Sequence, residues 1–290
     1  MANSEFKLSP DIKLGPVSLK VRDLGLMESF YERDVGLTVL HRDKSLIQFG
    51  AGSSKEPILE LNEFPDSTKP PEDAAGLYHY ALLVPDRKNL AATYLTLGNK
   101  GTVFDGFADH LVSEALYLTD PENNGIEIYR DRSRDEWRFD EEGYVDMTTQ
   151  PLDIDSLLRE VAGVPREDLR ALADGTRVGH IHLKVTNLQR SIAFYRTMVG
   201  LELTRFWGNA AFLSTGRYHH HVGMNTWESL GGEPVKKDWT GLGHFTITIP
   251  NENLRELSQR MADSPLVYGQ GTGQLLISDP DDIELVFKSR

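Results

Sequence analysis

The sequence has 290 residues, enough for about two domains that each bury a hydrophobic core. It carries 31 basic and 44 acidic side chains, and the resulting net charge of −13 argues against binding to nucleic acid or to an anionic membrane surface. The absence of cysteine excludes disulfides, zinc–thiolate sites, iron–sulfur clusters and thiol nucleophiles. No apolar stretch is long enough to span a membrane and no secretory signal is evident, so we expect a cytoplasmic protein.

An internal repeat organises the chain. The segment 17–24, VSLKVRDL, is similar to the segment 181–188, IHLKVTNL. Further matches follow in the same order along both copies: Phe30-Tyr31 with Phe194-Tyr195, Gly36-Leu37 with Gly200-Leu201, 79–85 with 244–250, and Asp120-Pro121 with Asp279-Pro280. Because the landmarks keep their order, the sequence indicates a duplicated domain.

Each copy predicts the same series of elements. An alternating apolar segment predicts a strand with one buried face, and a helix and short strands follow it. A second unit of the same kind begins at His79 and again at His244. The expected strands are 17–21, 46–49, 181–185 and 211–214, and the expected helices are 87–97, a helix ending near Gly200, and 253–262. The fold class is therefore α+β, with tandem βαβββ modules, two in each domain and four in the chain.

The repeat also predicts the domain boundaries. We expect an N-terminal domain at 1–131 and a C-terminal domain at 178–290. The polar stretch 132–177 between them is interpreted as a linker with two short helices, at 154–161 and 166–173.

Histidines in the strands of the second copy point to a metal site. His180 and His182 share one face of their strand, because strand side chains alternate in direction. His244 opens the equivalent strand of the next unit, and Glu284 lies between two apolar neighbours and points away from them. Two neutral imidazoles and one carboxylate suit Fe(II), Mn(II) or Ni(II), and Zn(II) less selectively.

Two longer segments carry a family resemblance. The segment 180–195, HIHLKVTNLQRSIAFY, followed by Gly200-Leu201, resembles the opening of the vicinal oxygen chelate superfamily. That superfamily includes glyoxalase I, fosfomycin and bleomycin resistance proteins, and the type I extradiol dioxygenases. The segment 109–132, DHLVSEALYLTDPENNGIEIYRDR, is similar to the two-domain bacterial catechol-2,3-dioxygenase group. The resemblance implies mixed curved sheets that form an open barrel around a metal site.

The resemblance also implies a site and a reaction. It assigns the metal ligands to His180, His244 and Glu284, and the acid–base role to His220, with His219 and His221 as neighbouring candidates for that role. The implied cofactor is Fe(II), or Mn(II) in its place. The implied substrates are a catechol and dioxygen, and the ring opens beside the diol.

The first copy departs from this pattern. Pro16 stands where His180 stands in the second copy, and proline cannot bind a metal through its ring nitrogen. We therefore expect a degenerate copy without a complete metal triad. The rival interpretation is that His79, Glu60 and Glu127 hold a second metal there.

A tyrosine is the second departure. Extradiol enzymes usually place one on the strand before the Asp-Pro turn, where the second copy has 274–277, QLLI. The matching residue, Tyr117, lies in the first copy with His110 before it. Either this group manages without that tyrosine, or Tyr218 or Tyr268 replaces it.

Two other functions compete with ring cleavage. A glyoxalase-I-like lyase or isomerase would use a fourth, acidic ligand on the strand at 219–225, where no carboxylate occurs. A non-catalytic small-molecule-binding resistance protein would generally lack the triad.

The tryptophans of the second copy have two interpretations. Trp207, Trp227 and Trp239, with the loop 229–238, form either a lid over the site or ordinary packing. Open sheet edges make a homo-oligomer plausible.

Overall fold

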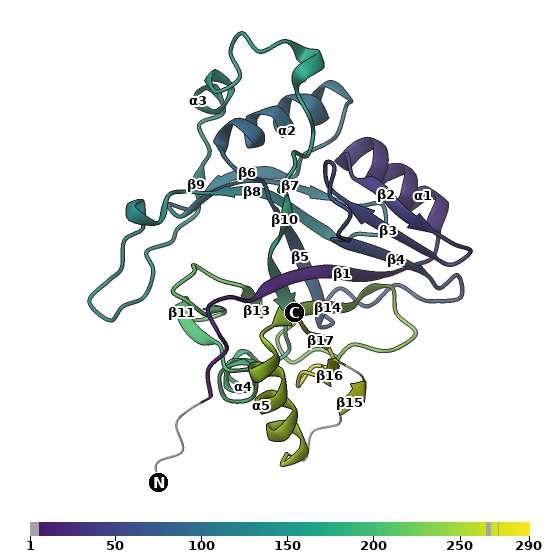
Figure 1. Cartoon of the computed structure of the whole chain (residues 1–290), viewed down its shortest axis with the longest axis vertical. Coiled ribbons are helices and arrows are strands. Elements are labelled where there is room, and N and C mark those ends of the chain that lie inside the picture. Colours follow the sequence, from purple (N-terminus) through teal and green to yellow (C-terminus); the bar gives the residue numbers. More distant parts are fainter. Residues whose placement is uncertain (1–5, 265–267, 272) are drawn as a thin grey trace.

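The structure confirms the predicted α+β fold, with four βαβββ units in succession (Figure 1). The computed structural model describes residues 6–264, 268–271 and 273–290. The first unit consists of β1 (Lys13–Val21), α1 (Leu24–Ser29) with its π-helical continuation η1 (Phe30–Val35), β2 (Thr38–Arg42), β3 (Leu46–Gly50) and β4 (Leu59–Glu63). The second consists of β5 (Gly76–Leu83), α2 (Arg87–Asn99), β6 (Gly106–Asp109), β7 (Ser113–Thr119) and β8 (Gly125–Asp131).

The second half of the chain repeats this order. The third unit consists of β10 (Arg177–Lys184), α4 (Leu188–Phe194) with η4 (Tyr195–Val199), β11 (Glu202–Phe206), β12 (Ala210–Ser214) and β13 (Val222–Asn225). The fourth consists of β14 (Gly241–Ile249), α5 (Asn251–Ala262), β15 (Tyr268–Gly271), β16 (Gln274–Ser278) and β17 (Glu284–Ser289). Between the halves lie η2 (Arg134–Glu136), β9 (Gln150–Pro151), α3 (Ile154–Arg159) and η3 (Arg166–Asp168). Among the described helices, none has the length and apolar character needed to cross a membrane.

Each of the two sheets contains strands from both halves of the chain. The first and fourth units share an eight-stranded sheet in the order β15-β16-β17-β14-β1-β4-β3-β2. The second and third units share a nine-stranded sheet in the order β11-β12-β13-β10-β5-β8-β7-β6-β9. At the centre of each sheet two strands of different halves pair antiparallel, β1 with β14 and β5 with β10 (Figure 1). A site at either centre therefore draws residues from both copies.

The helices α1 and α4 begin and end with the same local signals. Asp23 and Asn187 are the N-caps, and each side chain accepts the backbone N–H three residues later. Gly36 and Gly200 close the π-helical continuations with φ angles of 87° and 85°, a conformation that favours glycine. The duplicated sequence thus carries duplicated boundaries.

One predicted helix is absent. The segment 166–173 forms only the short turn η3, which ends at Leu169, and the residues that follow are irregular. This non-helical backbone buries Leu169, Ala171 and Leu172. The Thr93 hydroxyl donates to the carbonyl of Ala171, which ties this segment to α2. Burial of three apolar side chains outweighs local helix preference here.

The hydrophobic core is continuous between the two halves. Leu19, Tyr80, Ile181 and Phe245 belong to four different units and are almost completely buried within one apolar cluster. Separating the halves would expose this cluster to water, so burial of apolar area stabilises the shared sheets.

A buried tyrosine–aspartate pair anchors each Asp-Pro turn to the helix of its own half. The Tyr31 hydroxyl donates to Asp120 Oδ2 at 2.7 Å, and the Tyr195 hydroxyl donates to Asp279 Oδ2 at 3.2 Å. Burial raises the pKa of Asp120 to about 6 and that of Asp279 to about 7, against the effect of the hydrogen bonds that each carboxylate accepts. Both turns therefore contain an acid whose ionisation the fold opposes.

Replacement of Asp279 by Asn is expected to flatten the pH dependence of stability. The folded-state pKa of about 7 lies above the ordinary value of 3.8, so the folded protein retains a proton that the unfolded chain releases. The free energy of unfolding of the natural chain should therefore fall as pH rises through this interval, by at most about 1.4 kcal/mol per pH unit from this group. Urea unfolding of both proteins at several pH values measures the difference.

A difference between the two proteins that stays constant with pH would contradict this prediction. Asp120→Asn is the matched variant in the other copy. Its effect should be smaller, because the pKa of Asp120 is raised only to about 6.

Candidate metal centre

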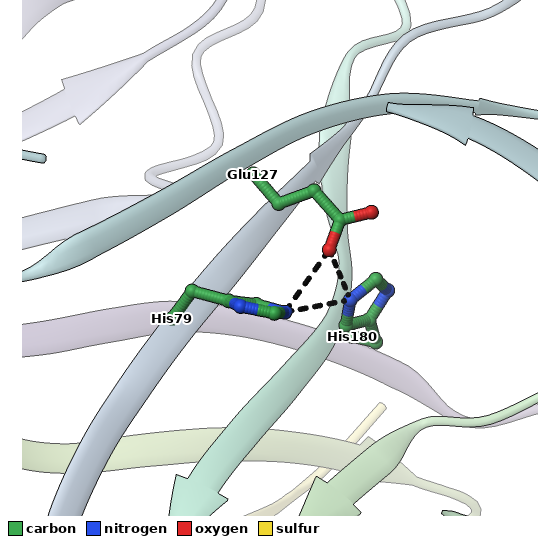
Figure 2. A group of neighbouring side chains, drawn as sticks. All are labelled: His79, Glu127 and His180. Atoms are coloured by element: carbon green, nitrogen blue, oxygen red, sulfur yellow. Dashed lines mark hydrogen bonds and ion pairs between the residues drawn. The ribbon is translucent and has the colours of Figure 1, made fainter. Parts of the chain in front are cut away.

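Three buried side chains converge in the nine-stranded sheet, and they come from both halves of the chain. His79 lies on β5, Glu127 on β8 and His180 on β10 (Figure 2). Ala81 on β5 is the register partner of both His180 and Glu127, and His79 lies two residues earlier on the same face. Because the side chain of Ala81 is small, the longer side chains of His180 and Glu127 on either side can approach each other above it.

The distances fit a shared ion. Glu127 Oε2 lies 3.0 Å from His79 Nε2 and 3.1 Å from His180 Nε2, and the two Nε2 atoms are 3.3 Å apart. Ligands at right angles around an ion, with bonds of about 2.1 Å, are separated by about 3 Å. The three donor atoms are therefore spaced like one face of an octahedron, the arrangement of the two-histidine, one-carboxylate sites that leave other positions open.

The charges also fit a cation. Burial opposes ionisation of Glu127, but the imidazoles of His180 and His79 outweigh it and hold the pKa of Glu127 well below its usual range. Burial lowers the pKa of His180 to about 4, although Glu127 opposes the shift. The centre thus combines an ionised carboxylate with a neutral imidazole whose lone pair can bind a metal.

The structure does not bring His180 together with the other two predicted ligands. His244 lies on β14 and Glu284 on β17, both in the eight-stranded sheet, and they line a different cavity. His180 instead lies beside His79 and Glu127. The predicted triad assumed that the two units of the C-terminal half share one sheet, whereas each of them pairs with a unit of the N-terminal half.

Strand register explains why Glu284 is not the counterpart of Glu127. His79 pairs with Gly125, and His244 pairs with Glu284 in the equivalent place. Glu284 therefore corresponds to Gly125, and the residue that corresponds to Glu127 is Val286. The turns after Asp120-Pro121 and Asp279-Pro280 have the same length, but the Ile-Glu pair follows the second turn two residues earlier, which hides this shift in the sequence.

The equivalent place in the eight-stranded sheet lacks two of the three donors. Ser18 pairs with His244 as His182 pairs with His79, so Pro16 corresponds to His180. That sheet therefore presents Pro16, His244 and Val286 where the other presents three donor side chains.

The rival grouping of His79 and Glu127 with Glu60 is also not formed. Glu60 lies on β4 in the eight-stranded sheet and accepts a hydrogen bond from Gln48 Nε2 at 2.8 Å. His79 and Glu127 meet His180 on the other sheet.

The centre opens into a cavity of about 450 Å³. Much of its wall is aromatic, with Tyr78, Trp207, Phe212 and Trp227 among the lining residues. The segment between the halves contributes as well, since Met147 lines the cavity. A volume of this size suits a small organic molecule.

The three consecutive histidines of the second half have different environments. His220 lines the cavity, and its ring centroid lies 4.2 Å from that of His180. His219 is completely buried behind it, and His221 hydrogen-bonds to the Ser214 hydroxyl at 2.7 Å. Of the three, His220 alone is among the residues that line this cavity, so its acid–base role stays a prediction.

Tyr117 of the first copy lines the same cavity. His110 Nδ1 donates to the carbonyl of Thr148 at 2.7 Å, so its Nε2 is free to accept the Tyr117 hydroxyl at 2.8 Å. Burial and the charge of Glu127 hold the pKa of Tyr117 well above its usual value, and the hydroxyl keeps its proton. Tyr218 is buried on Asp131 instead, and the side chain of Tyr268 lies outside the described residues.

The predicted lid is only partly formed by the expected residues. Trp207 and Trp227 line the cavity, and Trp227 is 47% exposed at its rim. Trp239 and Val235 line separate cavities, so that tryptophan and its loop do not cover the centre.

Comparisons with known proteins agree with this architecture. Residues 13–128 and 177–287 match the model of the glyoxalase/bleomycin resistance protein/dioxygenase superfamily. The chain belongs to this superfamily. It is 36% identical over 274 residues to the catechol-2,3-dioxygenase of Bacillus subtilis strain 168, covering 93% of this chain and 94% of that protein.

Two solved structures of low sequence identity show the same fold. The cppA protein of Streptococcus pneumoniae is 14% identical, with a TM-score of 0.61 and coverage of 99% of this chain and 100% of that one. Glyoxalase I of Zea mays is 15% identical, with a TM-score of 0.56 and coverage of 96% and 92%.

In this superfamily member, the first copy contained a signal for the clustered donors. The segment that holds His110, Tyr117 and Glu127 is the one that resembles the dioxygenase group most specifically. Assigning the ligands by that segment would have selected Glu127 and, with the strand beside it, His79.

Substitution of each clustered residue should remove the metal. We expect His79→Ala, Glu127→Ala and His180→Ala to lower metal affinity by more than the ~10–100-fold typical of outer-shell partners, because each deletes a donor atom. His244→Ala and Glu284→Ala are the matched controls on the other sheet and should leave metal content unchanged. Metal analysis after loading and desalting measures the result. Loss of metal from the two control variants would contradict the assignment.

Proposed function

We propose that the protein is an extradiol dioxygenase that opens the ring of catechol, or of an uncharged substituted catechol, beside the diol. The observation that carries the proposal is the donor face of His79, Glu127 and His180 at the wall of a cavity. The Bacillus subtilis relative named catechol-2,3-dioxygenase supports the same reaction. His79 and Glu127 are thus our proposed ligands, in place of the predicted His244 and Glu284.

The proposed metal is Fe(II), and Mn(II) is the alternative. Imidazole and carboxylate ligands without thiolate suit both ions, so the donor set fits either. When bound, the ion would supply the redox chemistry that activates dioxygen and a centre for the two diol oxygens. In the overall reaction the carbon–carbon bond beside the diol breaks, and both atoms of dioxygen enter the product.

The side chains around the centre have distinct proposed roles. His220 would accept and return a proton, since it faces the same cavity next to His180. Tyr117, held by His110, would offer a protonated hydroxyl to an oxygen of the substrate. The aromatic wall would orient the ring and exclude water.

The lining of the cavity supports an uncharged substrate. Among the described residues that line it there is no lysine or arginine. Besides Glu127, the lining contains one carboxylate, Asp105, which is exposed and accepts the Thr119 hydroxyl at 2.6 Å. A carboxylate on the substrate ring would thus be buried without a cationic partner, which is costly.

Oxygen consumption by Fe(II)-loaded protein with catechol tests the proposed function. The expected result is uptake of one dioxygen for each catechol, together with a yellow ring-opened product. Metal-free protein should consume none, because no other group in the described cavity can activate dioxygen. Isomerisation of a thiol adduct without oxygen uptake would instead support the glyoxalase-like alternative, and copurification of an unchanged ligand would support a binding protein.

His220→Gln provides the internal control for this experiment. The variant should retain metal, because His220 is not part of the donor cluster. Its turnover should fall by about 10²–10⁴-fold, the usual contribution of acid–base catalysis. Loss of metal from His220→Gln would make His220 a ligand and not a proton carrier.

The charge of the ring substituent should set substrate preference. We expect kcat/KM for 4-methylcatechol to exceed that for 3,4-dihydroxybenzoate by about 100-fold or more, because burial of an unpaired carboxylate costs several kcal/mol. Trp227→Arg at the rim should lower this ratio of kcat/KM values, because the new guanidinium can pair with the carboxylate of 3,4-dihydroxybenzoate. Leu230→Arg adds the same charge at an exposed position that does not line the cavity, and should leave the ratio unchanged. Equal rates with both substrates in the natural protein would contradict the preference.

A further inference from the structure

A chain of hydrogen bonds connects His220 to a carboxylate behind the cavity wall. His220 Nδ1 lies 2.8 Å from His219 Nδ1, and His219 Nε2 lies 2.8 Å from Asp131 Oδ1. Asp131 comes from the end of β8, the strand that also carries Glu127. Glu127 and Asp131 are four residues apart and lie on the same face of that strand.

The carboxylate determines which nitrogen of each ring carries a proton. An ionised Asp131 can only accept, so His219 must donate to it from Nε2. A neutral His219 then has a lone pair at Nδ1, and the contact to His220 is a hydrogen bond only if His220 donates from its own Nδ1. His220 is left with a lone pair at Nε2, which makes no hydrogen bond to any described residue.

Aromatic rings enclose the side chain of His219. Its ring is completely buried and lies against those of Tyr218, His220 and Trp137, with centroids 4.1, 4.6 and 5.3 Å away. Both ring nitrogens are used in the two hydrogen bonds that the side chain makes, one to His220 and one to Asp131.

We propose that Asp131 and His219 are positioning residues that hold the proton of His220 on Nδ1 and so present Nε2 to the cavity as an acceptor. The importance of this for turnover rests on the role of His220 in the proposed function. The arrangement itself does not, because it follows from hydrogen-bond geometry alone.

The Tyr218 hydroxyl provides a contrast within the same cluster. It lies 2.9 Å from Asp131 Oδ2 and 3.2 Å from Oδ1, the oxygen that accepts His219, and it contacts the Tyr129 hydroxyl at 2.8 Å, but it hydrogen-bonds to neither histidine. Tyr218→Phe therefore removes a buried hydrogen bond from Asp131 while leaving Asp131, His219 and His220 in place.

Nitrogen NMR of the full chain tests the proton positions directly. The protein is labelled with ¹⁵N-histidine and loaded with Zn(II) as a diamagnetic ion, and the His220 signals are identified by their absence in His220→Gln. We expect a protonated Nδ1 and an unprotonated Nε2 for His220, and the reverse for His219. A proton on Nε2 of His220, or a doubly protonated His219, overturns the proposal. This readout stands even if the protein does not open catechols.

A matched pair of variants tests the consequence for turnover. His219→Asn places an amide oxygen near the position of Nδ1 and can still accept the proton of His220, whereas His219→Leu cannot. We expect His219→Leu to lower kcat by about 10-fold or more with KM and metal content unchanged, and His219→Asn and Tyr218→Phe to stay within about threefold of the natural protein.

Equal effects of His219→Leu and His219→Asn on kcat would overturn the positioning role, whatever their size. An effect of Tyr218→Phe as large as that of His219→Leu would also overturn it, because packing of the cluster and not proton placement would then be responsible. Should His219→Leu fail to fold, the NMR result on the natural chain still decides. Absence of oxygen uptake by the natural protein would refute the proposed function but not the assignment of protons.

Discussion

The antiparallel pairing of β5 with β10 is the constraint on which the candidate site depends. It joins the two halves of the chain in one sheet and sets Ala81 opposite His180, while the parallel neighbour β8 sets Glu127 opposite Ala81 from the other side. A shift of one residue in either pairing would turn the affected side chain to the opposite face of the sheet. The continuous core beneath both sheets resists such a shift, because it would expose buried apolar side chains.

The same scaffold occurs twice in the molecule, and only one occurrence carries three donors. The pairing of β1 with β14 repeats the geometry of β5 with β10, but Pro16 and Val286 stand at two of the donor positions. The cavity of that sheet is lined instead by charges of both signs, including Lys20, Glu60 and Glu284. Duplication therefore supplied two frameworks of similar shape, and the side chains alone distinguish the proposed metal centre from its counterpart.

Burial gives the proposed centre its chemical character. Glu127 is ionised in spite of desolvation because two imidazoles lie within hydrogen-bonding distance of one of its oxygens. Two chains of hydrogen bonds also end at the cavity. One joins Tyr117 to His110, and the other joins His220 through His219 to Asp131. One chain ends on the half-buried carboxylate of Asp131 and the other on the backbone carbonyl of Thr148, which restricts the orientation of the groups that face a substrate.

Much of this protein could be predicted from the sequence by itself, because the governing interactions are local. Alternating apolar residues, capping residues such as Asp23 and the glycine at Gly36 determined the four βαβββ units. The strand pattern placed His180 and His182 on one face and indicated the kind of donor set. Which units share a sheet was decided only by the tertiary structure. Strands of either neighbouring unit could satisfy the same backbone hydrogen bonds, and the choice depends on packing between residues about a hundred positions apart, such as His79 and His180. That pairing placed Glu127 and Tyr117 of the first copy beside His180, and it moved His244 and Glu284 to the other sheet.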